Sequence, residues 1–286
     1  MSRVAYVNGR YVPHREGAVH IEDRGFQFAD SVYEVCEIRD GALIDATRHL
    51  DRLDRSLAEL RMPAPMGRAA LLVVLREVAR RNRVVEGSVY LQATRGAAPR
   101  DFPFPAGVRP TLVVTARARP RAEAEARAAK GVKVVTRPDQ RWARRDIKTT
   151  GLLANALAKQ YAREQGAFEA WLVDADGFVT EGSSSNAWIV TKDGRLVTRA
   201  ADHDILRGVT RTTLIDVLAA EGLTFEERAF TVAEALEARE AFMTSATSIV
   251  TPIVAIDGRW IGNGAPGLVA TRLRAAFHAR AEHTPV

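Results

Sequence analysis

Hydrophobic and polar residues alternate along much of the chain, and the alternating segments predict short strands joined by tight turns. Residues 4–12 form a predicted hairpin whose two-residue turn, Asn8-Gly9, has a composition typical of such turns. A longer alternating segment, 31–39, is followed by the turn Asp40-Gly41 and a short strand at 42–44. The remaining strands are expected at 87–95, 110–117, 132–136, 169–173, 178–180, 186–190 and 196–198, and near Ala241 and Ile249.

Segments with apolar residues every three or four positions predict helices between these strands. One helix is expected at 47–61, with Thr47 as its N-cap. Its apolar face carries Leu50, Leu53, Leu57 and Leu60. Further helices are expected at 67–82, 152–165 and 210–221, after Thr231, and from Gly267. Hairpin-linked strands with interspersed helices indicate an α+β fold and not a doubly wound parallel sheet.

The best candidate for a linker begins at Arg119-Pro120-Arg121 and continues into residues rich in alanine and glutamate. We therefore expect an N-terminal α+β domain at 1–118, an interdomain linker at 119–125 and a C-terminal domain at 126–286. The chain has 286 residues, of which 47% are hydrophobic, so it can bury one or two ordinary cores.

Several features indicate a cytoplasmic protein without membrane contact. The longest apolar runs, such as 69–75, are far shorter than a membrane span, and the N-terminus enters a strand pattern without a signal peptide. The single cysteine, Cys36, excludes an internal disulfide. Of the 41 basic residues 36 are arginine, but they are scattered singly and form no aromatic-interleaved basic tract. We therefore expect no nucleic-acid partner, although a net charge of +6 keeps a basic binding module as the alternative class.

A lysine and a carboxylate in unusual surroundings carry the strongest chemical signal. Lys148 is one of only five lysines, and Glu181 follows 33 residues later, ahead of Gly182 and three serines. Pyridoxal phosphate (PLP) enzymes need such a pair, because an amine forms a Schiff base with the cofactor and an acid partners its pyridinium nitrogen. We expect Arg144 and Arg145 to lower the pKa of a desolvated Lys148. We expect serine hydroxyls and backbone amides to keep Glu181 ionised.

A helix start within 205–212 is a candidate phosphate site. Helix N-termini offer unpaired N–H groups and a favourable dipole, and Gly208 lets an anion approach the backbone. Thr210 either adds a hydroxyl or merely caps the helix. A second cluster of small residues at 244–248 could complete the phosphate cup.

These segments, together with 23–34 and the turn at 256–258, resemble the fold-type IV PLP aminotransferases over essentially the whole chain. The resemblance is greatest to D-amino acid aminotransferases, with branched-chain aminotransferases and aminodeoxychorismate lyases as relatives. It implies a two-domain fold, with a small N-terminal α/β sandwich and a larger C-terminal pseudo-barrel. It also implies a homodimer with PLP as its cofactor and no metal.

The resemblance also assigns residues to roles. Lys148 is implied as the Schiff-base lysine and proton carrier, Glu181 as the pyridinium partner, and Arg52 as a phosphate ligand. Ala246 stands where the family has a hydroxyl, so only its amide is available and Thr247 is the substitute. The other implied cofactor contacts are Val209 and Thr210 at the phosphate, Leu206 against the ring, and Ser183 and Ser184 near it.

The substrate side of the resemblance contains one departure. Tyr33 and Arg100 match residues that hold the substrate carboxylate, Val35 lines the pocket, and the loop with Arg100 and Phe102 reaches the neighbouring subunit's active site. Phe102 stands where D-amino acid aminotransferases have a histidine, which removes one donor and adds an apolar wall. An arginine–carboxylate pair survives this loss, because a bidentate fork is the stronger interaction.

The sequence therefore predicts a PLP-dependent transaminase that moves the amino group of a D-amino acid to pyruvate or 2-oxoglutarate in two ping-pong half-reactions. Phe102 keeps an (R)-selective primary amine transaminase open as an alternative, against which Arg100 argues. An L-branched-chain aminotransferase is disfavoured by the D-type run at 94–100, and an aminodeoxychorismate lyase would eliminate instead of transferring.

Overall fold

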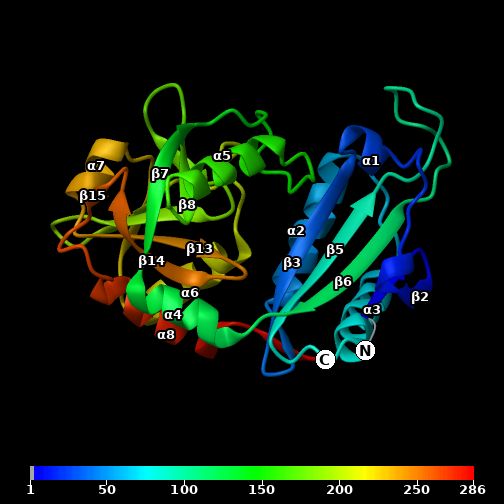
Figure 1. The fold of residues 1–286 in the computed structure, drawn as a ribbon, viewed down its shortest axis with the longest axis horizontal. Helices are drawn as coiled ribbons and strands as arrows, with labels where there is room; N and C mark the ends of the chain where they lie inside the picture. Colours follow the sequence, from blue (N-terminus) through cyan, green and yellow to red (C-terminus); the bar gives the residue numbers. More distant parts are fainter. Residues whose placement is uncertain (1–2) are drawn as a thin grey trace. The chain divides into compact units, whose positions relative to one another are not determined.

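The computed structural model describes residues 3–286 and divides the chain into two compact units (Figure 1). The first contains the described residues up to Arg121, together with Ile147–Gly151 and Glu282–Val286. The second contains Ala122–Asp146 and Leu152–Ala281. Two short segments expected in the C-terminal domain thus pack with the first unit, and the domain bounds from the sequence stay a prediction.

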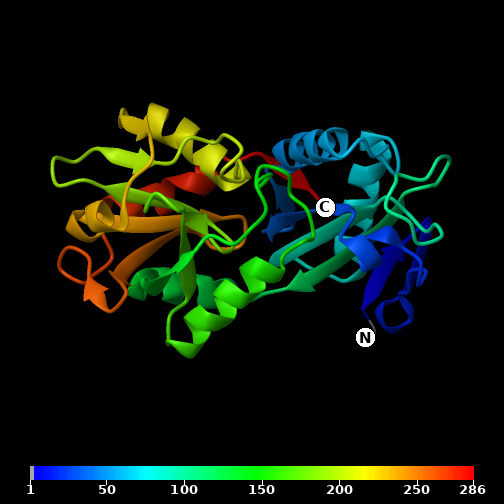
Figure 2. The ribbon, with the colours of Figure 1, turned by 90° about the horizontal axis from the view of Figure 1, so that it is seen from above.

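The first unit is built on a seven-stranded sheet with the order β16-β4-β3-β5-β6-β1-β2. Helices α2 and α3 lie along one face of this sheet (Figure 2), and leucines of α2 pack into the core between them. The strands are β1 (Val4–Val7), β2 (Arg10–Pro13), β3 (Ser31–Arg39), β4 (Ala42–Ile44), β5 (Gly87–Thr94), β6 (Thr111–Ala118) and β16 (His283–Pro285). The helices are η1 (His14–Glu16), α1 (Arg24–Phe28), α2 (Ala46–Glu59) and α3 (Arg68–Arg81).

The second unit is built on a nine-stranded sheet with the order β12-β11-β10-β13-β14-β7-β8-β9, to which β15 adds beside β14. The strands are β7 (Val132–Pro138), β8 (Glu169–Val173), β9 (Val179–Gly182), β10 (Asn186–Val190), β11 (Leu196–Thr198), β12 (Phe225–Glu227), β13 (Glu240–Ser245), β14 (Ile249–Ile256) and β15 (Arg259–Trp260). The helices are α4 (Arg121–Lys130), α5 (Leu153–Glu164), α6 (Val209–Ala220), α7 (Val232–Glu237) and α8 (Leu268–Arg280).

The second sheet curls back on itself, as the expected pseudo-barrel requires. Strand β9 ends the sheet order, yet only three residues separate it from β10 near the opposite end. The amide of Gly182 donates to the carbonyl of Ser185 (2.7 Å) and so closes this turn. The two sheets and their covering helices confirm the α+β fold class.

Most predicted elements are present, with differences of one or two residues at their ends. The hairpin turns at Asn8-Gly9 and Asp40-Gly41 have positive φ at both residues, as type I′ turns require. The stretch expected as linker contains the start of α4, because alanine and glutamate favour a helix. The two units meet along the chain between Arg121 and Ala122, inside this stretch, and the linker stays a prediction. One expectation was wrong. The N-cap of α2 is Asp45, and Thr47 lies inside the helix with its hydroxyl bound to Glu282 (2.9 Å).

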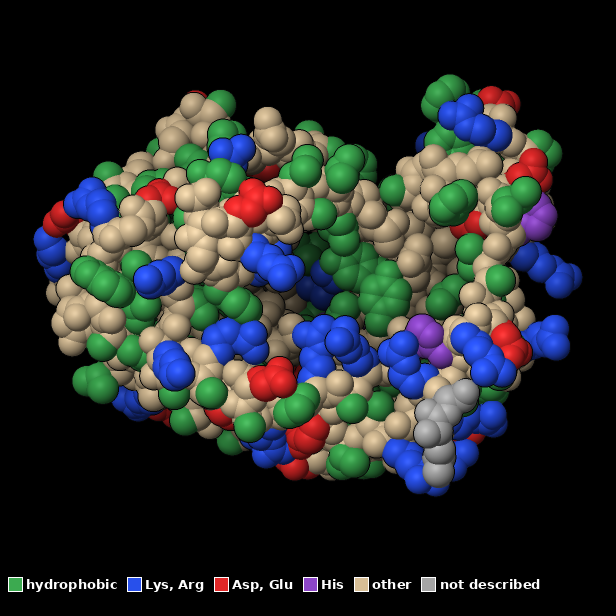
Figure 3. All heavy atoms as spheres, in the orientation of Figure 1, with side chains coloured by type: hydrophobic (Ala, Val, Ile, Leu, Met, Phe, Trp, Pro, Cys, Tyr) green, Lys and Arg blue, Asp and Glu red, His purple; other side chains and the backbone are tan. Residues whose placement is uncertain are grey.

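Basic side chains are spread over the visible surface of the chain among acidic, apolar and neutral ones (Figure 3). Many arginines there belong to ion pairs, for example Arg80 and Arg81 with Glu77. Among residues 3–286, no helix is both long and apolar enough to cross a membrane.

Candidate active site

Lys148 is anchored in the first unit, beside the start of β3. On β3, strand β4 pairs with only the last two residues, Ile38 and Arg39. The first residues of β3 are free to pair with segment 147–151, through a bridge between Val32 and Thr149. The amide of Tyr33 donates to the carbonyl of Lys148 (3.0 Å), and the amide of Lys148 donates to Ser56 Oγ of α2 (3.4 Å). The lysine therefore has a backbone fixed by both a strand and a helix.

The Lys148 side chain lies against an aromatic pair. Its Nζ atom is 4.2 Å from the ring centre of Tyr33, whose ring lies 5.7 Å from that of Tyr90. Burial raises the pKa of Tyr90 to about 12, with a smaller contribution from Tyr33, so this phenol stays neutral. The structure thus brings together Lys148 and Tyr33, two residues that the sequence predicted for the site.

Arg52 lies on the other side of β3, in a buried ion-pair cluster. Its Nε and Nη2 atoms donate to the two carboxylate oxygens of Glu34 (2.7 Å each), and His49 Nδ1 lies 2.7 Å from Glu34 Oε2. Burial works to raise the pKa of Glu34, but Arg52 and His49 outweigh it and lower this pKa to about 2. Glu34 and His49 were not among the predicted site residues. Their signal was present, because His49 and Arg52 are three residues apart on one helical face.

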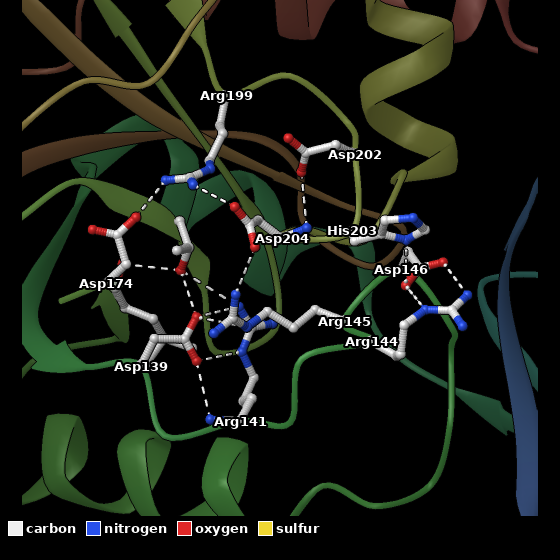
Figure 4. A network of polar contacts seen from close by, with 12 residues as sticks. Asp139, Arg141, Arg144, Arg145, Asp146, Asp174, Arg199, Asp202, His203 and Asp204 are labelled. Carbon is white, nitrogen blue, oxygen red and sulfur yellow. Dashed lines mark hydrogen bonds and ion pairs between the residues drawn. The ribbon is translucent and has the colours of Figure 1, made fainter. Parts of the chain in front are cut away.

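The two arginines expected beside Lys148 are paired with carboxylates of the second unit (Figure 4). Arg144 Nε and Nη2 donate to Asp146 (3.0 Å each). Arg145 pairs with Asp204 (3.0 Å), and its Nε atom lies 3.3 Å from Asp139, whose side chain is buried. They therefore do not supply the uncompensated positive charge that was expected next to Lys148.

Glu181 is buried in the second unit, on strand β9, which extends two residues beyond the strand expected at 178–180. Its carboxylate accepts hydrogen bonds from Arg141, from Asn186 Nδ2 (2.8 Å) and from the amide of Leu206 (3.1 Å). Burial raises the pKa of Glu181 above its usual range, and Arg141 and Leu206 only partly oppose the shift. Sequence reasoning missed Arg141, which nothing in its local sequence distinguishes among 36 arginines.

The serines after Glu181 bind another carboxylate. The hydroxyls of Ser183, Ser184 (2.7 Å) and Ser185 (3.2 Å) donate to Glu169 of β8, and Lys159 Nζ lies 3.3 Å from it. The expectation that serine hydroxyls hold Glu181 was therefore wrong. The reason is the antiparallel register of β8 and β9, which places Gly182 opposite Trp171 and the serines that follow beside the start of β8. Ser183 and Ser184 stay predicted cofactor contacts, although their hydroxyls donate to Glu169 in this structure.

The start of α6 is not capped by any side chain. Gly208 is its N-cap, and Thr210 is the second helical residue and so does not cap it. A Cβ atom at Gly208 would lie 2.0 Å from Asn186 Oδ1, so this close approach requires glycine. Asn186 Nδ2 also donates to the carbonyl of Leu206 (2.9 Å). Asn186 thus joins the helix start to Glu181 within one unit.

The other predicted phosphate contacts lie in the turn between β13 and β14. Ala246 is half-buried and Thr247 is exposed in this turn. Thr244 of β13 is the register partner of Asn186 in β10, which connects the turn to the strand that begins at Asn186. Leu206, Val209, Thr210, Glu181 and this turn all belong to the second unit.

The loop with Arg100 and Phe102 lies in the first unit, and hydrogen bonds to its backbone hold it in place. The buried Arg24 donates to the carbonyls of Asp101 and Phe102, and Asp30 fixes Arg24 through its Nε atom (2.8 Å). Phe102 itself is 76% exposed. The Arg100 guanidinium carbon lies 5.1 Å from the ring centre of Phe28 and 5.9 Å from that of Phe102. The half-buried Val35 lies two residues after Tyr33 on β3 and points to the same side.

Comparison with known proteins decides the family. The family model for amino-transferase class IV matches residues 31–256. The chain belongs to this family. It is 43% identical over 270 residues to a D-alanine aminotransferase of Bacillus licheniformis, covering 94% of each chain. It is 37% identical to a D-alanine aminotransferase of Staphylococcus haemolyticus, covering 96% of each.

Solved structures of class IV enzymes share the fold. A branched-chain amino acid aminotransferase from T.th., solved with pyridoxamine 5′-phosphate, has a TM-score of 0.89 at 28% identity, covering 97% of this chain and 93% of that one. The Escherichia coli branched-chain enzyme also has a TM-score of 0.89, at 23% identity, and covers 98% and 94%. The chain is thus a PLP-dependent aminotransferase of fold type IV.

The residues of this class IV enzyme fit PLP. The N-terminus of α6, which no side chain caps, suits a phosphate. Glu181 is a buried acid with a raised pKa, which suits a cationic ring nitrogen. Lys148 has a primary amine, which is the group that a cofactor aldehyde requires.

Proposed function

We propose that this class IV enzyme transfers the amino group of a D-amino acid to a 2-oxo acid, pyruvate or 2-oxoglutarate, in two ping-pong half-reactions. The observation that supports this choice most strongly is the 43% identity, over 94% of both chains, to a protein named D-alanine aminotransferase. Tyr33 and Arg100, which the family resemblance implies for carboxylate binding, are both present. We also propose the cytoplasm as its location.

Lys148 acts as the attachment point of the cofactor and as the acid–base group. Its backbone is fixed to β3 and α2, so the amine reaches the reacting carbon from a constant position. With PLP bound, Lys148 would be the group that holds the cofactor aldehyde and that moves the substrate's Cα proton. Tyr33, against which Nζ packs, limits the directions available to the amine.

Glu181 and Arg141 control the cofactor ring nitrogen. PLP, when bound, supplies a ring that withdraws electrons from the Cα–H bond, most strongly when its nitrogen is protonated. A buried carboxylate whose charge is only partly compensated gains free energy from a cationic neighbour. Glu181 therefore holds a proton on the ring nitrogen, and Arg141 keeps Glu181 ionised. Leu206 would lie against the ring of a bound cofactor, with Ser183 and Ser184 near it.

The phosphate is held by Arg52 together with the first N–H groups of α6, at Val209 and Thr210. An uncapped helix start favours an anion through both its unpaired N–H groups and its dipole. Ala246 adds its amide, and Thr247 replaces the missing hydroxyl. We propose that these groups and Lys148 act on the same cofactor.

The substrate carboxylate is bound by Arg100 and Tyr33 beside Val35, with Arg100 and Phe102 contributed by the partner subunit of a homodimer. Large apolar side chains are exposed on α5, where Leu153 is 75% and Leu157 62% exposed, and an interface would cover such a surface. Phe28 and Phe102 provide aromatic surfaces near the Arg100 guanidinium. These rings would orient Arg100 in place of the histidine that the family has at position 102.

An (R)-selective amine transaminase is the second candidate, because one observation favours it. The exposed Phe102 ring offers an apolar contact and no hydrogen bond to a substrate carboxylate. Amines without a carboxylate would lose less binding free energy than amino acids from the missing hydrogen bond at this position. Arg100, whose charge would then face an uncharged substrate, makes this the weaker proposal.

A donor panel separates these functions. The purified enzyme is incubated with 2-oxoglutarate and either D-alanine, L-leucine or (R)-1-phenylethylamine, and D- and L-glutamate are quantified separately. We expect D-glutamate from D-alanine at the highest kcat/KM. A higher kcat/KM with (R)-1-phenylethylamine would favour the second candidate. L-glutamate from L-leucine, or pyruvate released from aminodeoxychorismate without an acceptor, would overturn both.

A further inference from the structure

The first unit contains a buried carboxylate, Glu34, at a position where an apolar residue would be expected. Residues Val32, Cys36 and Ile38 occupy the same face of β3, are at most 4% exposed, and pack into the apolar core under α2. Glu34 is 1% exposed on that face. Burying a carboxylate costs free energy unless it is paired, and an apolar replacement is often equally stable. Fold stability alone therefore does not account for Glu34.

The contacts of Glu34 are all directed to one face of α2. Both of its oxygens accept from Arg52, one from Nε and one from Nη2, at 2.7 Å. The second oxygen is also 2.7 Å from Nδ1 of His49, which is 4% exposed. A bidentate fork defines the plane of the guanidinium, so it also sets the direction in which Nη1 points. His49 in turn fixes the carboxylate.

We propose that Glu34 is a positioning residue that orders Arg52 in advance for the phosphate of PLP, with His49 holding Glu34 in place. The proposal rests on the proposed role of Arg52 as a phosphate ligand. A free arginine side chain loses much rotational freedom when it binds an anion, and an ordered one has already lost it. Glu34 thus strengthens phosphate binding although it carries the same sign of charge as the phosphate.

The test compares two ligands that differ only in the phosphate. Apoenzyme freed of cofactor is titrated with PLP and with pyridoxal, and the two Kd values are read from the absorbance of the bound aldehyde. Their ratio measures the contribution of the phosphate. We expect Glu34→Gln to raise the Kd for PLP about 10- to 30-fold, the size of ordering an arginine side chain, with an unchanged Kd for pyridoxal.

Glu77→Gln is the matched control. Glu77 also pairs with two arginines, Arg80 at 2.7 Å and Arg81 at 2.6 Å, but on the surface of α3. We expect this variant to leave both Kd values unchanged. If Glu34→Gln weakens PLP and pyridoxal equally, Glu34 merely supports the fold and the proposal fails.

A double-mutant cycle tests whether Glu34 acts through Arg52. Lysine keeps the charge at position 52 but lacks the fork, so Glu34→Gln should change the Kd ratio little in an Arg52→Lys background. An undiminished effect there would overturn the positioning role. An unchanged ratio in Arg52→Lys alone would instead refute Arg52 as the phosphate ligand, which separates the two failures.

A second variant covers the case in which Glu34→Gln does not fold. Glu34→Asp keeps the charge but shortens the reach to the fork. We expect a melting temperature near that of the parent and a Kd for PLP raised less than tenfold. A Kd for PLP equal to that of the parent would count against the proposal, because the geometry of the fork would then be irrelevant.

Discussion

The two units each bury one glutamate against one arginine, yet the two pairs differ in their electrostatics. Glu34 accepts both hydrogen bonds of an Arg52 fork and lies against His49, and its pKa falls to about 2. Glu181 receives one contact from Arg141, which also binds Asp139 with two of its other nitrogens. The pKa of Glu181 is raised by burial above all, and the charge of Asp139 adds to this shift.

The difference indicates which carboxylate still has negative charge to pair with a cationic group of the cofactor. Glu34 accepts two hydrogen bonds from Arg52 and lies against His49, so its charge is compensated and its role is to position Arg52. Arg141 is divided between two carboxylates, so Glu181 remains short of positive charge. A protonated ring nitrogen is the cation that would complete it. A buried glutamate beside an arginine thus orders that arginine in the first unit, whereas in the second unit it can bind a further cation.

The largest expected effect comes from Lys148, which belongs to the first unit. Lys148→Ala removes the amine that attaches the cofactor and carries the proton, and we expect kcat to fall about 10⁴-fold or more. Single-turnover mixing with D-alanine measures the loss. Lys192→Ala is the control, since Lys192 is exposed and paired only with Glu237. Full turnover in Lys148→Ala would remove this lysine from the mechanism.

Glu181→Gln should lower kcat about 10²- to 10³-fold, the loss typical of one preorganised charge at a reacting group. Glutamine keeps the shape, but it has one accepting oxygen where Glu181 uses two, and it cannot hold a proton on the ring nitrogen. Glu34→Gln should instead act mainly on the Kd for PLP, so the two variants sharpen the contrast between the pairs. If both variants changed kcat and the Kd for PLP in the same way, the proposed difference in role between Glu181 and Glu34 would be wrong.

Acid unfolding should distinguish the pairs by sign. The folded-state pKa of Glu34 is about 2 against an ordinary 4.5, so its contribution of about 3 kcal/mol is present above about pH 4.5 and is lost as pH falls toward 2. Glu181 has a raised pKa, so its contribution is present below about pH 4.5 and is lost as pH rises through the raised value.

Urea unfolding of apoenzyme at a series of pH values measures both contributions. We expect Glu34→Gln to lose less stability on acidification than the parent. Glu181→Gln should lose less stability than the parent as pH rises from about 4.5. Parallel curves for all three proteins would show that neither carboxyl has the assigned shift.

The smallest effect is expected at Phe102. Phe102→His adds one hydrogen-bond donor for a substrate carboxylate, and we expect the preference for D-alanine over (R)-1-phenylethylamine to rise about tenfold. The ratio of the two kcat/KM values measures it. Val73→His places the same residue at another exposed apolar position, on α3, and should leave the ratio unchanged. An unchanged ratio in Phe102→His would place Phe102 outside the carboxylate site.

Local sequence determined most of the elements and the pairing of near neighbours. Asn8-Gly9 and Asp40-Gly41 specify their turns because few other residues accept positive φ at both positions. Leucines at helical spacing gave the buried face of α2, and the fold class followed from the order of the elements. Lys148, Glu181 and Arg52 could be named because the motifs around them resemble those of one family.

Only the tertiary structure decided which charged groups meet. The sequence did not indicate that three serines would bind Glu169, that Arg144 and Arg145 would pair with aspartates, or that Arg141 would reach Glu181. Each of these contacts joins side chains whose spacing depends on sheet register and curl, not on local propensity. A charged side chain is compatible with many partners, and the fold selects among them by which ones it buries together.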